Sequence, residues 1–178
     1  MKKQEKLELI QRAISEKEIC RCYFSYDEGS YFYCYPNAVN DKFILGQEED
    51  DFLLDGYFIR KISQLKKVEI RADNCNKINQ MLGVTNQIAH PGVDISDWRS
   101  IFESLSHMDT YIIIEDIINA QFAVGVIEKV LKDKLYFKHF NAKGVWDENG
   151  LEIRYSQITG VEWGTRYDTR WKAYLERT

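Results

Sequence analysis

Four cysteines are the residues of this chain best suited to hold a metal ion, and all lie in its first half: Cys20, Cys22, Cys34 and Cys75. Structural Zn²⁺ sites usually draw their thiolates from paired Cys-x-x-Cys motifs. Cys20 and Cys22 are instead separated by a single residue, and the second half of the chain has no cysteine. We therefore interpret the four as buried thiols that pack as small apolar side chains, and we expect no metal and no other cofactor.

Carboxylates and imidazoles could also supply catalytic chemistry. The acidic run Glu48-Glu49-Asp50-Asp51 lacks the glycine-containing loop of a Ca²⁺ site, so we interpret it as a solvated hairpin tip. His90, His107 and His139 are isolated from one another in the sequence. The chain has no Gly-x-Ser-x-Gly, no phosphate-binding glycine loop and no His-Glu-x-x-His. We expect that it is not an enzyme.

One segment, residues 163–171, combines aromatic and basic side chains, the types that stack on bases and pair with phosphates. In the alternative interpretation, Tyr167 and Trp171 pack a final helix onto the strands before it. Five residues are our candidates for a binding surface: Trp146, Arg154, Arg166, Tyr167 and Arg170.

The overall charge argues against a nucleic-acid protein. The 178 residues carry a net charge of −4, and the basic and acidic residues number 13 and 14 in residues 1–92 and 11 and 14 in the remainder. Neither half has the basic excess that neutralises phosphates. No apolar run is long enough to cross a membrane, and the charged start of the chain has no apolar core behind it, so we expect a cytoplasmic protein.

The chain contains a segment that occurs twice in similar form. Residues 63–69, Ser-Gln-Leu-Lys-Lys-Val-Glu, return 93 residues later as Ser-Gln-Ile-Thr-Gly-Val-Glu at 156–162. Asp41-Lys42 returns as Asp133-Lys134 at nearly the same offset. A near-constant offset predicts two copies of one module. We assign residues 1–83 to the first repeat, 84–95 to a linker and 96–178 to the second repeat.

Each repeat reads as a helix, five short strands and a short helix, which predicts a mainly β fold with short helices (α+β) and two small bent barrels. Amphipathic spacing predicts helices at 3–17 and from Ser96 through Met108, the second with a core-packing stripe from Trp98 to Met108. Short helices follow at 75–82 and 167–176. Two-residue periodicity predicts strands at 20–26, 31–35, 43–47, 57–61, 65–71, 111–117, 122–127, 134–140, 151–154 and 158–163, with a turn at 27–30.

A helix leading into five strands, the last two written as residues 56–60 and 65–70, resembles the Sm-like branch of the SH3-type barrels. The second half is also similar to a group of uncharacterised bacterial proteins, although Asn141 stands where that group has an aspartate. The matching segments are residues 140–146, 153–155, 158–161 and 164–167. The resemblance implies two tandem Sm-like, SH3-type five-stranded small barrels, each preceded and followed by a helix.

The RNA pocket of the Sm family is incomplete here. Residues 37–41 stand near its Asp-x-x-Met-Asn run without the methionine, and Arg60-Lys61 and Arg154-Tyr155 lack the glycine of its Arg-Gly pair. We therefore expect a non-catalytic interaction module that binds a protein or peptide partner through a small-barrel surface, as a monomer or small homo-oligomer without membrane contact. The alternative is an RNA or single-stranded nucleic-acid binding protein of Sm-like type.

We predict that the purified protein does not bind nucleic acid tightly at physiological salt, because both halves are net acidic and phosphate contacts need basic side chains. The measurement is a titration of a panel of single-stranded RNAs. Sub-micromolar binding of any of them would show this expectation to be wrong.

Overall fold

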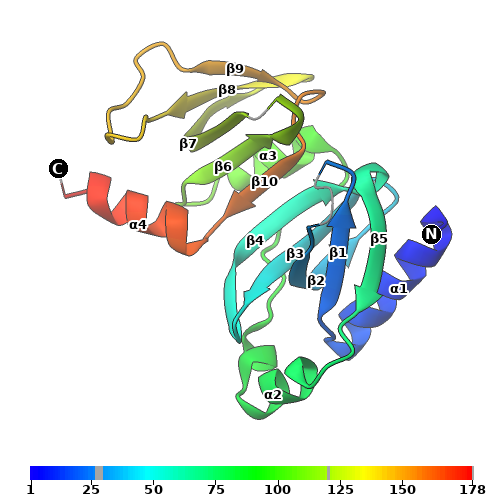
Figure 1. The fold of residues 1–178 in the computed structure, drawn as a ribbon. Helices are drawn as coiled ribbons and strands as arrows, with labels where there is room; N and C mark the ends of the chain where they lie inside the picture. The colour runs from blue at the N-terminus through cyan, green and yellow to red at the C-terminus, as the bar shows by residue number, and fades with distance from the viewer. Residues whose placement is uncertain (27–29, 120, 178) are drawn as a thin grey trace. The chain divides into compact units, whose positions relative to one another are not determined.

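The computed structural model describes residues 1–26, 30–119 and 121–177, and it shows a mixed α+β protein in which antiparallel strands predominate (Figure 1). The chain divides into two compact units, Met1–Pro91 and Gly92–Thr178. The division falls inside the segment 84–95 that the sequence suggested as a linker. The turn predicted at 27–30 lies largely outside the described residues.

The first unit begins with helix α1 (Lys3–Glu16), and its five strands are arranged in the order β5-β1-β2-β3-β4. A short helix, α2, and the 3-10 turn η2 follow the strands. The strands and these two elements are β1 (Cys20–Phe24), β2 (Phe32–Val39), β3 (Phe43–Asp50), β4 (Leu53–Lys61), β5 (Leu65–Ile70), α2 (Cys75–Met81) and η2 (Val84–Gln87).

The second unit begins with helix α3 (Trp98–Leu105), and its strands are arranged in the order β10-β6-β7-β8-β9. Helix α4 (Arg166–Leu175) closes it. The strands are β6 (Ile112–Asp116), β7 (Gln121–Val130), β8 (Lys134–His139), β9 (Leu151–Arg154) and β10 (Gly160–Trp163).

The two units therefore share one strand order, in which the fifth strand of the unit pairs with its first. The repeated Ser-Gln pair occupies the connection between the fourth and fifth strands in both, within the 3-10 turn η1 (Ile62–Gln64) and within the turn after β9. The sheet is open: in each unit the fourth and fifth strands are the two ends of the order. Two closed five-stranded barrels are therefore not confirmed, whereas the mainly β, α+β class is.

The interior of the first unit is filled by side chains from α1 and from one face of its strands. Ile10 and Ala13 of α1 are fully buried there, with the thiols of Cys22 and Cys34 3.7 Å apart. All four cysteines are buried and free, as expected of thiols that pack as apolar side chains. The described residues include no group of three or more His, Cys, Asp or Glu side chains arranged to hold a metal ion.

The acidic run is only in part the solvated hairpin tip that was predicted: Asp50 and Asp51 are exposed at the β3–β4 turn, whereas Glu49 is buried. Strand β3 extends through Asp50, and the chain reverses at Asp51 and Phe52, whose φ angles are 48° and 68°. The side chain of Glu49 is only 1% exposed. Two further boundaries also differ: β2 continues past Pro36 through a bulge, and Asp97 rather than Ser96 caps α3. All three differences from the prediction depend on strand register or on side-chain hydrogen bonds, which composition does not encode.

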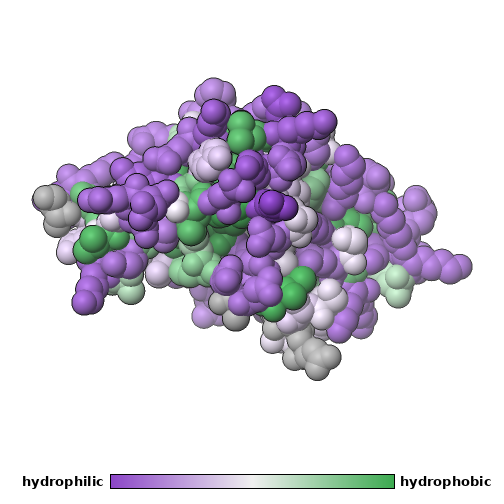
Figure 2. Space-filling view, turned by 90° about the horizontal axis from the view of Figure 1, so that it is seen from above, coloured by the Kyte–Doolittle hydropathy of each residue, from purple (hydrophilic) through white to green (hydrophobic). Residues whose placement is uncertain are grey.

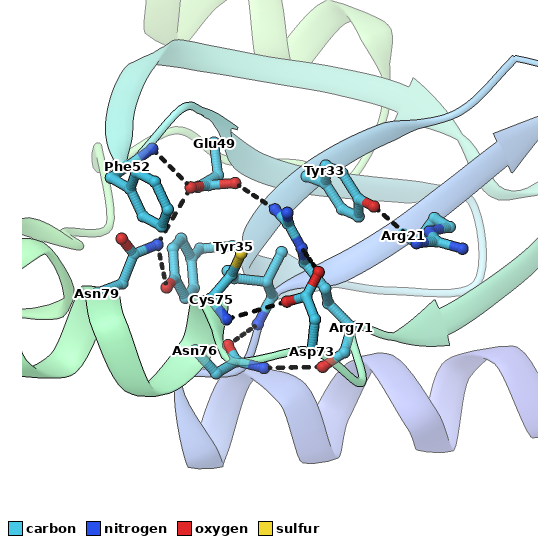
Figure 3. Close-up of polar contacts among 11 residues, drawn as sticks. Arg21, Tyr33, Tyr35, Glu49, Phe52, Arg71, Asp73, Cys75, Asn76 and Asn79 are labelled. Atoms are coloured by element: carbon cyan, nitrogen blue, oxygen red, sulfur yellow. Dashed lines mark hydrogen bonds and ion pairs between the residues drawn. The ribbon is translucent and has the colours of Figure 1, made fainter.

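Glu49 anchors α2 to the sheet (Figure 3). Its carboxylate accepts hydrogen bonds from the backbone N–H of Phe52 (2.9 Å) and the Asn79 amide (3.2 Å), and it forms an ion pair with Arg71 (3.0 Å). Arg71 also binds Asp73 at 2.9 Å. Asn79 in turn donates to the Tyr35 hydroxyl at 3.0 Å. A buried carboxylate is tolerated because it is paired and hydrogen-bonded in this way.

An aromatic cluster packs α4 against the rest of the second unit. Trp171 lies 5.0 Å from Phe140, and Trp146 lies 5.2 Å from Phe140 and 5.7 Å from Tyr111, all between ring centroids. Thr165 caps the helix by accepting from the backbone N–H of Asp168. None of the helices in the described part of the chain has the length and hydrophobicity needed to cross a lipid bilayer.

We predict that Asp73 makes the first unit sensitive to acid. Hydrogen bonds from Arg71 and from the backbone N–H of Cys75 lower the pKa of Asp73 to about 2. A carboxyl whose pKa is lowered on folding stabilises the fold above its unfolded value of about 4, and this contribution is lost as pH falls to about 2. The urea midpoint of Asp73→Asn should lie below that of the parent above pH 5, and the difference should close near pH 2.

The matched control is Asp133→Asn, which removes an exposed carboxylate from the β7–β8 turn. Its urea midpoint should follow that of the parent at every pH. A constant difference between Asp73→Asn and the parent from pH 5 to pH 2 would contradict the prediction.

Candidate functional site, a pocket in the second unit

The candidate binding residues do not form one surface. Trp146 packs inside the aromatic cluster, and Arg154 is the exposed last residue of β9. Arg166 and Arg170 are exposed on α4. Tyr167 is 50% exposed, and its ring lies 6.0 Å from that of Phe122. Trp171 packs against Phe140 as the alternative interpretation of residues 163–171 required.

The pocket that Phe122 borders lies within the second unit and has a volume of about 420 Å³. Its walls come from β6, β7, β8 and β9 and from the turn after β9. The apolar lining residues are Ile114, Phe122, Ala123, Leu151 and Ile153, and the polar ones are Asp116, Gln121, His139, Glu152 and Gln157. A pocket of this size that combines apolar and polar side chains is in the range of small ligand sites.

The register of the strands explains why this space is open. Val68 and Val161 hold the same place in the repeated segment, and they pair with Cys22 and Ile114. Two residues further along β1 and β6 stand Phe24 and Asp116. Matching the two units in this way aligns an aromatic residue of the first with a smaller residue of the second at three positions: Phe24 with Asp116, Phe32 with Ala123, and Phe58 with Leu151.

In the first unit these three rings fill the interior. Phe24 stacks on Phe32 at 5.5 Å, and Phe32 meets Phe58 edge-on at 5.0 Å. The guanidinium carbon of Arg60 lies 5.5 Å from the centre of the Phe32 ring. In the second unit Ile153 takes the position of Arg60, so neither the rings nor the guanidinium is present. The residues at the four matched positions, Asp116, Ala123, Leu151 and Ile153, all line the pocket.

Gly125 allows β7 and β8 to approach closely where Gly125 pairs with His139. A Cβ atom at Gly125 would lie 1.9 Å from the carbonyl oxygen of Lys138 and 2.8 Å from Cα of His139, so β8 crosses closer than any side chain permits. His139 is one of the residues that line the pocket. Its Nδ1 is buried and has no hydrogen-bond partner among the described residues.

The carboxylates of the pocket differ in their partners. Glu152 forms an ion pair with Lys134 at 2.8 Å, and this hydrogen bond lowers its pKa. Asp116 is only 9% exposed and accepts hydrogen bonds from the backbone N–H of Asn119 (3.3 Å) and from its side-chain amide (2.6 Å). An ionised carboxylate has about four acceptor positions, so Asp116 can accept more.

Strand β9 forms one wall of the pocket and is also an edge strand. Within the described residues of this unit it pairs with β8 alone. Its four residues are mostly exposed, and two large apolar side chains beside the pocket are exposed as well, Phe122 by 57% and Leu151 by 36%. On the face of the molecule that Figure 2 draws, hydrophobic residues also reach the surface among hydrophilic ones.

Reasoning from the sequence did not find this pocket. Asp116 and Ala123 were predicted to lie in the strands 111–117 and 122–127. No residue that lines the pocket was among the candidates for a binding surface. The signal was present in the repeat: aligning the two copies strand by strand would have exposed the loss of Phe24, Phe32 and Arg60. The chain matches no protein-family model, no curated protein and no solved structure.

We predict that Ala123→Phe stabilises the protein. A ring at this position would enter the pocket, as Phe32 enters the interior of the first unit, and bury apolar surface worth about 1–2 kcal/mol. The measurement is the free energy of unfolding in urea. Ala142→Phe, which adds a ring to an exposed loop residue, is the matched control and should not stabilise. Destabilisation by Ala123→Phe would mean that the pocket cannot accept a side chain.

Proposed function

We propose that this protein is a non-catalytic interaction module that binds an extended segment of a protein partner along β9, with one side chain of the segment in the adjacent pocket. A single observation carries the proposal: the same strand is both an unpaired edge and a wall of a cavity of about 420 Å³. Peptides that add a strand to a sheet gain affinity from main-chain hydrogen bonds and specificity from pockets for alternate side chains.

The composition of β9 favours binding of a specific partner over nonspecific pairing with the strands of other molecules. Glu152 and Arg154 alternate with Leu151 and Ile153 along four residues. Charged side chains and short length protect an edge from aggregation, so an added strand needs a further source of affinity. The pocket supplies it, because Leu151 and Ile153 line it together with Ile114 and Ala123.

We further propose that the two units are copies of one Sm-like module, of which the second has the more open interior. Their common strand order and the Ser-Gln pair at the same connection support this origin. In this proposal the first unit is the structural partner, because Phe24, Phe32 and Phe58 already fill its interior.

The proposal is tested by selecting displayed random dodecapeptides on the immobilised protein. Selected peptides should bind the parent and bind Ala123→Phe at least about tenfold more weakly, since the new ring occupies the pocket. Ala142→Phe should bind like the parent. In amide NMR spectra the same peptides should shift the signals of residues 151–154. Peptides that bind Ala123→Phe equally well and leave these signals unchanged would refute the proposed site.

A further inference from the structure

The pocket in the second unit is acidic as well as apolar. Its lining contains two carboxylates, Asp116 and Glu152, and no lysine or arginine. Glu152 is neutralised by Lys134, whereas Asp116 has no ion pair among the described residues and accepts only from Asn119. A site with an unpaired carboxylate over an apolar floor suits a cation carried on an apolar stem.

The first unit shows how this interior holds such a group. Arg60 is only 8% exposed, with its guanidinium carbon 5.8 Å from the centre of the Phe24 ring and 5.5 Å from that of Phe32. One of its terminal nitrogens donates to the hydroxyl of Tyr26 at 2.9 Å. The interior of this fold therefore accommodates an arginine that arrives from the fourth strand of the unit.

In the second unit the residues at the positions of Arg60 and Phe24 are both different. Ile153 stands in the position of Arg60, and Asp116 stands in the position of Phe24. The second unit thus has a carboxylate in this interior and no guanidinium of its own at the position that corresponds to Arg60. A guanidinium from a bound segment could take that place.

Resting on the proposed function, we infer that the side chain which enters the pocket is an arginine of the bound segment. Its methylene groups would lie against Ile114, Ala123 and Ile153, and its guanidinium would reach Asp116. A planar guanidinium can donate two parallel hydrogen bonds to one carboxylate, which the ammonium of lysine cannot do. Arginine is therefore preferred to lysine here.

The first test needs no ligand. Ile153→Arg would place a guanidinium on β9 within the reach that Arg60 has toward Phe24, so its effect on stability should depend on Asp116. In a double-mutant cycle with Asp116→Asn, the unfolding constants should show a favourable coupling of about fivefold or more. Ile153→Met, which adds a long neutral side chain, should show no coupling with Asp116→Asn. Absence of coupling for Ile153→Arg would overturn the inference.

The second test uses fluorescein-labelled nonapeptide pools with a fixed central residue between four random residues on each side. The pool with central arginine should bind at least about tenfold more tightly than the pool with central citrulline, the neutral isostere, and more tightly than the lysine pool. Asp116→Asn should remove the preference of arginine over citrulline, and Asp133→Asn should leave it intact.

The outcomes separate this inference from the function on which it rests. If the pools bind the parent but arginine and citrulline, or arginine and lysine, bind alike, the arginine assignment is wrong and the peptide site stands. If no pool binds and no displayed peptide is selected, the peptide-binding function itself is wrong. A preference for arginine that persists in Asp116→Asn would also overturn the role given to Asp116.

Discussion

The inward-facing side chains of each five-stranded unit have to pack against one another, and the two units meet this constraint differently. In the first unit Phe24, Phe32 and Phe58 pack against one another, and Arg60 covers them. Close packing of this kind leaves no room for a ligand. In the second unit smaller residues stand at the same places, and an opening of about 420 Å³ remains. The packing of one unit and the pocket of the other both follow from which rings the strands carry inward.

Burial of charge imposes a second condition on the first unit. The carboxylate of Glu49 is almost inaccessible to water, and Arg71, Asn79 and the backbone of Phe52 supply its partners. These contacts join β3, the residue that follows β5, and α2, so the short helix is held by polar contacts in addition to its apolar ones. Removing one partner of such a network leaves a buried group unsatisfied, which costs more than the lost hydrogen bond. The network therefore contributes specificity to the position of α2.

Much of the fold could be predicted from the sequence, because periodicity reports which residues face inward. Each of the four predicted helices and ten predicted strands has a counterpart among the described residues, and the predicted stripe is buried from Trp98 to Leu105 but not at Met108. Burial of Glu49 in the acidic run was missed because composition alone cannot show that Arg71 pairs with it. The pocket was missed for a related reason. It depends on residues absent from places that are recognisable only once β1 and β6 are in register with their neighbours.

An unfilled interior would be costly if it were sealed, since each lining atom would lose its contacts and gain no water. This pocket is bordered by exposed residues such as Gln121, Phe122 and Glu152, so water can solvate its polar rim. The penalty then falls mainly on the apolar floor of Ile114, Ala123 and Ile153, which remains in contact with solvent. In the function that we propose, a ligand that covers this floor would bury apolar surface and so gain hydrophobic free energy. The looser packing of the second unit would then be the source of the affinity that we propose for a partner.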